Sequence, residues 1–202
     1  MKGESLKLLP EKAIYWGKKE YLILSDLHLG KAGHFRRNGI PISRNVHFED
    51  LRILETLLQV YQPTSVILLG DLFHSFKNNE WDDFLRFMDV YDFINFILVK
   101  GNHDILKDYP RCLDVVDRLD VSPFTFTHEK EEATLYNLSG HVHPGYRVSG
   151  LGRGGVTLPC FLFSENYGIL PAFGQFTGIK KIKKKEEDRI FGIVDSNIIE
   201  LI

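Results

Sequence analysis

Short apolar runs, each followed by a polar or glycine-containing turn, recur along the first half of the chain. Residues 21–24, 66–69 and 96–99 form runs of strand length. Between them, residues 48–61 and 81–91 place apolar side chains at helical spacing. Because parallel strands need long crossover connections, this alternation of strands and helices predicts a parallel sheet with helices beside it.

The second half of the chain is rich in strand patterns, and its last third has no helical pattern between them. The predicted strands are residues 124–126, 135–138, 159–163, 167–170, 190–194 and 198–202. Strands without intervening helices favour antiparallel pairing, so we expect the C-terminal strands to complete a second sheet. No repeat or linker-like segment interrupts the pattern, which predicts one α/β domain over residues 1–202.

The composition is that of a globular protein, and its charge is nearly balanced. Lys and Arg number 25 and Asp and Glu 27, so the overall field does not favour coating of nucleic acid, although a local basic patch stays open. Cys112 and Cys160 lie far apart, which excludes a disulfide framework and a cysteine-based zinc module. The N-terminus lacks the apolar core of a signal peptide, and the apolar runs are too short to span a membrane. These features predict a cytoplasmic protein.

Residue types that bind metal ions follow five of the predicted strands. They are Asp26 and His28, Asp71, Asn102, His128, and the pair His141 and His143. Since ligands of open α/β sheets bind beyond the carboxyl ends of the strands, we expect these seven residues to meet in one crevice. In extended chain, the spacings Asp26-x-His28 and His141-x-His143 place both side chains on one face. Either pair alone fits a solvated loop, but together the seven predict two metal ions, with Asp71 between them.

Taken together, these motifs resemble the calcineurin-like metallophosphoesterases. The resemblance is carried by Asp26-x-His28, Gly70-Asp71, Gly101-Asn102-His103-Asp104, His128 and Gly140-His141-x-His143. Residues 26–31, 35–37, 70–75, 140–144, 158–161 and 170–174 extend it, over nearly the whole chain, to the bacterial DNA-ligase-associated metallophosphoesterases. This resemblance implies a two-sheet β-sandwich flanked by helices. It also implies phosphodiester hydrolysis by a DNA repair endonuclease with two divalent metal ions, in association with a DNA ligase and a helicase.

Residue by residue, the resemblance implies two ligand sets that share one carboxylate. Asp26, His28, Asp71 and His143 would hold one ion, and Asp71, Asn102, His128 and His141 the other. Imidazole and amide ligands beside carboxylates favour Mn, Fe or Zn over Mg or Ca. The resemblance favours Mn, and an Fe/Zn pair stays open.

The resemblance also implies that His103 and Asp104 are catalytic. The leaving alkoxide must be protonated or stabilised, and His103 lies outside the ligand set with Asp104 beside it to orient the imidazole. An equally good interpretation makes Asp104 the cap of a helix that begins near Ile105. At His74 the wider superfamily often has Asp, and a structural histidine is favoured there over a role in the site.

Basic residues near the motifs are candidates for substrate contact. Lys31, Arg36 and Arg37 follow the first ligand motif and would flank the crevice, where Arg can grip phosphate oxygens, but solvated surface charge explains them equally well. The run Lys180, Lys181, Lys183, Lys184 and Lys185 is followed at once by acidic residues. We interpret it as a solvated hairpin loop, with nucleic-acid contact as the alternative.

The leading hypothesis is therefore a metal-dependent phosphodiesterase, a nuclease acting on DNA. A hydrolase of a small phosphodiester, nucleotide or phosphomonoester would use the same metal pair and stays open. A non-catalytic docking module is the third hypothesis, but such a module would be expected to lose ligands or His103, which this chain keeps.

Overall fold

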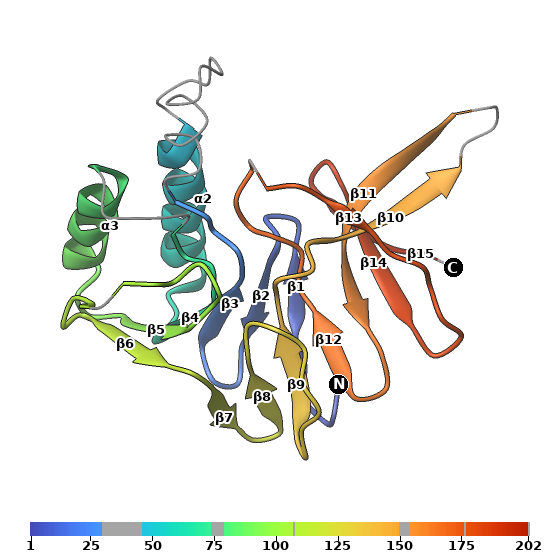
Figure 1. The fold of residues 1–202 in the computed structure, drawn as a ribbon, viewed down its shortest axis with the longest axis horizontal. Coiled ribbons are helices and arrows are strands. Elements are labelled where there is room, and N and C mark those ends of the chain that lie inside the picture. Colours follow the sequence, from blue (N-terminus) through green and yellow to red (C-terminus); the bar gives the residue numbers. More distant parts are fainter. Residues whose placement is uncertain (30–45, 74–78, 107, 150–153, 176, 202) are drawn as a thin grey trace.

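Two β-sheets and two α-helices make up the part of the chain that the structure, a computed structural model, describes (Figure 1). This part comprises residues 1–29, 46–73, 79–106, 108–149, 154–175 and 177–201.

The first sheet has six strands in the spatial order of the sequence. They are β1 (Lys7–Leu9), β2 (Ala13–Trp16), β3 (Tyr21–Leu24), β4 (Ser65–Leu69), β5 (Asn95–Val99) and β6 (Leu113–Val116). Strands β3 to β6 are parallel, which confirms the predicted parallel sheet. The hairpin β1–β2 adds antiparallel to β3, and neither it nor β6 was predicted.

The two predicted helices cross between neighbouring parallel strands. Helix α2 (Val46–Tyr61) precedes β4, and helix α3 (Asn79–Val90) connects β4 to β5. Both cover the same face of the first sheet (Figure 1). Leu54 of α2 and Phe84 of α3 are completely buried in one apolar cluster with Leu68 of β4. The apolar stripe of each helix therefore packs onto the sheet, as the helical spacing predicted.

The second sheet contains nine strands. They are β7 (Leu119–Val121), β8 (Phe124–Phe126), β9 (Tyr136–Ser139), β10 (Pro144–Ser149), β11 (Gly155–Phe163), β12 (Tyr167–Ile169), β13 (Lys180–Lys181), β14 (Arg189–Val194) and β15 (Asn197–Leu201). Strands β10, β11, β14 and β15 pair antiparallel as expected, but β9 pairs parallel with both β8 and β12. The expectation of antiparallel C-terminal strands was therefore wrong for β9 and for β13, which pairs parallel with β10; the β10–β11 hairpin provides the crossover between β9 and β12.

The second sheet covers the other face of the first sheet. Ile23, Ile67 and Leu69 alternate along β3 and β4 with the residues that face the helices, and they pack against Phe126 and Leu138 of the second sheet. Since β3 and β4 are buried on both faces, their near-continuous apolar sequence is explained. The fold is the predicted two-sheet α/β sandwich flanked by helices.

Two smaller expectations concern the cysteines and the membrane. Cys112 and Cys160 are both free thiols, in agreement with the excluded disulfide framework. None of the helices that the structure describes is long and apolar enough to cross a membrane.

Candidate functional site

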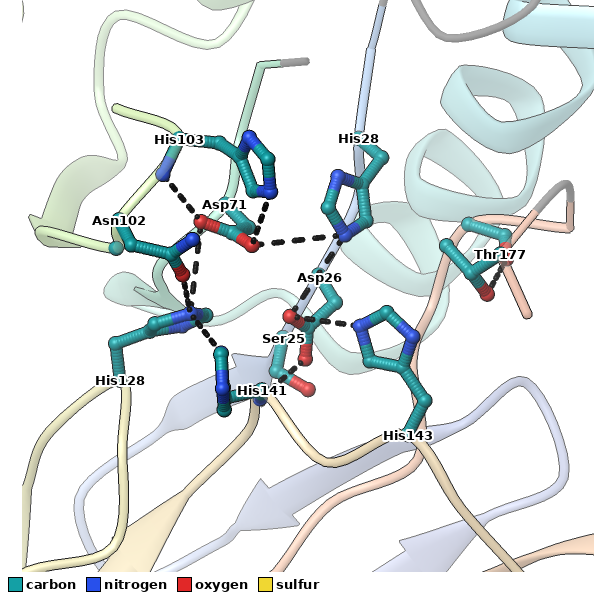
Figure 2. A network of polar contacts seen from close by, with 12 residues as sticks. Ser25, Asp26, His28, Asp71, Asn102, His103, His128, His141, His143 and Thr177 are labelled. Atoms are coloured by element: carbon teal, nitrogen blue, oxygen red, sulfur yellow. Dashed lines mark hydrogen bonds and ion pairs between the residues drawn. The ribbon is translucent and has the colours of Figure 1, made fainter. Parts of the chain in front are cut away.

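Polar side chains from both sheets converge where β3, β4, β5, β8 and β9 end (Figure 2). Two groups could each hold a metal ion, since their ligand atoms lie within 4.8 Å of one another: Asp26, His28 and His143, and Asp71, His128 and His141. Asn102 lies beside the second group, so the structure brings all seven predicted ligand residues together.

In the first group, a buried carboxylate faces two imidazoles. Asp26 Oδ1 lies 3.1 Å from His143 Nε2 and 3.9 Å from His28 Nε2. His143 Nδ1 lies 3.1 Å from the carbonyl oxygen of Gly178, which can only accept, so in the neutral imidazole Nδ1–H donates and Nε2 carries the lone pair. A lone pair and a carboxylate oxygen repel at this distance unless a proton or a metal ion lies between them. The first group therefore fits a metal ion.

The second group has the same kind of arrangement. His128 Nδ1 donates to the carbonyl oxygen of Leu69 at 2.9 Å, so when the ring is not protonated the lone pair is on Nε2. That Nε2 lies 3.1 Å from Asn102 Oδ1 and 3.1 Å from His141 Nδ1. Three atoms that can donate electron pairs thus meet at one point, with Asp71 Oδ1 3.5 Å from His128 Nε2. This donor set also fits a metal ion.

The carboxylate of Asp71 lies between the two groups. Its Oδ2 is 3.7 Å from His28 Nε2 in the first group, and its Oδ1 faces His128 in the second. The backbone N–H of His103 donates to Oδ1 at 2.9 Å and fixes the carboxylate (Figure 2). Each oxygen of Asp71 therefore faces a different group, which is the arrangement that a bridging ligand requires.

The electrostatics around Asp71 favour a positive charge beside it. Burial opposes ionisation of Asp71, but the contacts with His128 and with the His103 N–H outweigh it and lower the carboxyl pKa to about 2. Burial likewise opposes protonation of His128, but Asp71 and the Leu69 carbonyl raise the imidazole pKa to about 9. Whether it is a proton on His128 or a metal ion, a cation is stabilised at this place.

The backbone at the predicted ligands has an unusual conformation. Ten described residues other than glycine have positive φ, and five of them are Asp26 (54°), His28 (49°), Asp71 (50°), His141 (64°) and His143 (51°). The expectation that Asp26-x-His28 and His141-x-His143 are extended was therefore wrong: their side chains converge because the chain turns left-handed at each of these residues. Such conformations cost of order 1 kcal/mol or more and cluster at functional sites.

Two glycines allow the strand ends to approach the ligands closely. Gly70 has φ of 75°, and a Cβ there would overlap the His128 ring. A Cβ at Gly101 would overlap the Asp71 carboxylate. The second group can form only because both positions lack a side chain.

His103 and Asp104 lie next to the groups but in different surroundings. The His103 side chain is 43% exposed, with Nε2 4.0 Å from Asp71 Oδ2. Asp104 is buried, and its Oδ1 accepts from the N–H groups of Leu72 (3.0 Å) and Phe73 (3.4 Å) while its Oδ2 accepts from Gly101 (2.9 Å).

These contacts give Asp104 a position between the loops that follow β4 and β5. Burial raises the pKa of Asp104, and the backbone N–H groups that it accepts counteract part of this effect. The described residues between 101 and 112 form no helix, so the interpretation of Asp104 as the cap of a helix near Ile105 was wrong. The carboxylate instead ties the two loops together.

Sequence reasoning did not predict what supports the first group. The loop after β12 runs along the end of β3, where the N–H of Phe173 donates to the Ser25 carbonyl at 2.8 Å and that of Gly174 to the Asp26 carbonyl at 3.2 Å. The same loop provides the Gly178 carbonyl that orients His143. Residues 170–174 of this loop were part of the family resemblance, but the sequence did not predict that they contact the end of β3.

Some predicted residues cannot be placed in the site. Lys31, Arg36, Arg37 and His74 lie outside the residues that the structure describes. The lysine run is described, and its first two residues form β13 beside β10. The interpretation of the whole run as a hairpin loop was therefore wrong.

The chain is similar to a known protein family and to solved structures. A model of the calcineurin-like phosphoesterase family matches residues 20–189. The fold is similar to the crystal structure of Pseudomonas putida nuclease MPE, with 29% sequence identity and a TM-score of 0.82, over 98% of this chain and 96% of that one.

Two other solved structures are less similar. A predicted phosphoesterase from Streptococcus pneumoniae TIGR4 has 17% identity and a TM-score of 0.33, over 88% of this chain and 84% of that one. A phosphoesterase from E. coli has 13% identity and a TM-score of 0.44, over 90% of this chain and 97% of that one. Among curated protein sequences, none matches the chain.

Proposed function

Because the chain belongs to the calcineurin-like phosphoesterase family and is thus a phosphoester hydrolase, we propose that it is a nuclease that cleaves phosphodiester bonds of DNA. The observation that carries this proposal is the position of Asp71, with one carboxylate oxygen facing each of two groups of metal-binding residues. Similarity to the Pseudomonas putida nuclease over nearly the full length of both chains supports nucleic acid as the substrate.

In this proposal the seven residues hold two divalent ions. Asp26, His28, Asp71 and His143 would bind one, and Asp71, Asn102, His128 and His141 the other. The ions would supply positive charge to the phosphoryl oxygens and a water nucleophile at neutral pH. Given the imidazole and amide donors, Mn is our proposed metal, with Fe or Zn as the alternatives.

His103 is the proposed proton donor to the leaving group. Its Nε2 lies 4.0 Å from Asp71 Oδ2, and the side chain is 43% exposed, so a molecule in solution can reach it. As the P–O bond breaks, the imidazolium would transfer a proton to the departing oxygen, a contribution worth about 10²–10⁴-fold in rate.

Asp104 has a different role in this proposal. Its two oxygens accept backbone N–H groups, so it would act as a positioning residue that holds the His103 loop against the loop after β4. The carboxylate would thereby set the distance between His103 and Asp71.

The wider biological context follows from the family resemblance in the sequence. We propose a role in DNA repair in the cytoplasm, in association with a DNA ligase and a helicase. A pull-down of the purified protein against candidate ligases and helicases tests this association, and absence of binding to any of them would contradict it.

An activity panel tests the proposed function. Purified protein would be assayed on single-stranded DNA, duplex DNA, RNA, an aryl phosphodiester and an aryl phosphomonoester, each with Mn²⁺, Mg²⁺ or Zn²⁺, with Asp71→Asn as the control. We expect DNA cleavage with Mn²⁺ and none by the Asp71→Asn variant. Hydrolysis of the aryl substrates without DNA cleavage would favour a small-substrate hydrolase, and no turnover at all would favour a docking module.

A further inference from the structure

A row of lysines is fixed to the segment that carries His143. Lys180 and Lys181 form β13, which pairs parallel with the first residues of β10. The Lys180 N–H donates to the His143 carbonyl at 3.0 Å, and the Ile182 N–H donates to the Gly145 carbonyl at 2.9 Å. The row therefore begins directly beside a proposed metal ligand and continues away from it along the sheet edge.

Three of these lysines carry uncompensated charge. Lys180, Lys181 and Lys183 are exposed, and none has an ion-pair partner among the residues that the structure describes. The later lysines differ: Lys184 Nζ donates to the Leu201 carbonyl at 3.2 Å, and Lys185 Nζ lies 3.9 Å from Glu187.

The acidic residues that follow the run do not neutralise those three lysines. Glu187 faces Lys185, and Asp188 is buried, where its Oδ2 accepts the backbone N–H of Lys185. Glu186 is exposed and forms no ion pair within the described part of the chain, so none of the three acidic residues is paired with Lys180, Lys181 or Lys183.

The surroundings of β13 add to the positive charge. Residues 142–160 and 166–185 contain no Asp or Glu, although the whole chain has a net charge of −2. Arg147 is exposed two positions after Gly145, the residue that pairs with Lys181. Because side chains alternate along a strand, Arg147 and Lys181 lie on the same face of the sheet and Lys180 on the opposite face, so the lysines border this sheet edge on both sides.

We propose that Lys180, Lys181 and Lys183, here called the lysine strip, bind the phosphate backbone of a DNA strand and guide it to the metal centre. This inference rests on the proposed nuclease function. A small phosphoester bound at the metal centre has no further phosphates to reach the strip, whereas a polynucleotide does. Lysine ammonium groups on an exposed edge contact phosphates without reading bases, so the strip would contribute affinity without sequence preference.

The test compares two triple variants with the same change in net charge. The strip variant carries Lys180→Gln, Lys181→Gln and Lys183→Gln. The control carries Lys2→Gln, Lys7→Gln and Lys19→Gln, which replace exposed lysines before or at the starts of the N-terminal strands, whereas the metal centre follows the strand ends.

The readouts separate DNA binding from chemistry. For the strip variant we expect KM for a short single-stranded DNA to rise about tenfold, and the slope of log KM against log salt to become shallower by about 2. Turnover of an aryl phosphodiester should match the wild type, and the control variant should behave as wild type on both substrates. Fluorescence anisotropy with labelled DNA, in the Asp71→Asn background, measures binding without cleavage.

The other possible results distinguish a failure of the lysine strip from a failure of the proposed nuclease function. Equal DNA affinity and salt slope in the strip and control variants would overturn the lysine strip while leaving the nuclease function intact. Loss of aryl phosphodiester turnover in the strip variant would also overturn it, because the lysines would then support His143 structurally. Failure of the wild-type protein to cleave DNA would contradict the proposed function, whatever the strip does.

Discussion

The two groups that Asp71 joins have similar ligands but different surroundings. In the first, Asp26 is completely buried and His28 is 7% exposed, and the loop after β12 holds both the Asp26 backbone and the His143 ring. In the second, the His141 side chain is 40% exposed, and its Nε2 lies 3.7 Å from the exposed Glu129.

From this difference we expect the two groups to have different roles within one site. Each group has two buried residues and one imidazole held by a backbone carbonyl, but the outermost imidazole is 18% exposed in the first group and 40% in the second, which suits tighter retention of an ion in the first. The second group opens to solvent, as does His103, which suits exchange and access for the substrate. The following predictions test that expectation.

The largest effect is expected at Asp71, the residue that the two groups share. Asp71→Asn removes a negative charge that faces both groups, so both lose affinity for divalent ions. We expect kcat/KM to fall by about 10⁴-fold, equivalent to about 5 kcal/mol of lost stabilisation. Steady-state kinetics together with metal analysis checks this, and a variant that keeps both ions and full turnover would contradict the bridging role.

A change at His103 should affect the chemistry and leave metal binding intact. His103→Ala removes the proposed proton donor from the open side, and we expect kcat to fall by about 10³-fold with unchanged metal content. An aryl diester with a good leaving group needs less protonation, so the loss should be smaller on that substrate. Equal losses on DNA and on that aryl diester would exclude proton donation.

A change at Asp104 should act through the loops. Asp104→Asn leaves one accepting oxygen for N–H groups that now bind two, so we expect a loss of about 1–3 kcal/mol in the free energy of unfolding. Chemical denaturation of the metal-free protein measures it. Unchanged stability with a large loss of kcat would instead indicate direct contact between Asp104 and the reacting groups.

A pair of substitutions tests whether the two groups release their ions at different rates. In the wild-type protein we expect the ion of the second group to dissociate faster, by about tenfold. His141→Ala should remove this faster phase and leave one slowly released ion, whereas His143→Ala should remove the slow phase. Chelator-chase kinetics on both variants checks this, and identical release from the two groups would remove the distinction between them.

The sequence pattern predicted the parts of the fold in which the apolar signal is long and uninterrupted. Strands β3, β4 and β5 are buried on both faces and therefore read as continuous apolar runs. The edge strand β1 has three residues and begins with an exposed Lys, and β10 alternates in a partly exposed hairpin. Such strands are stabilised by their neighbours in the sheet and show little hydrophobic pattern in the sequence.

Which residues gather at the site was predictable, and their geometry was not. Positions after the strand ends predicted the seven residues that the structure brings together, because strand tips meet at one edge of a fold. The left-handed turns at Asp26 and His28, the backbone bonds of Asp104 and the position of Lys180 beside His143 all depend on contacts between segments distant in sequence. No local pattern encodes such contacts.

The central claim is that Asp71 links two metal ions, and crystals grown with Mn²⁺ test it most directly. Anomalous diffraction should show two peaks on opposite sides of the Asp71 carboxylate, one within coordination distance of Asp26 and His143 and the other of His128 and His141. A single peak that does not contact Asp71, or no peak at these residues in a protein that hydrolyses phosphodiesters, would contradict the account.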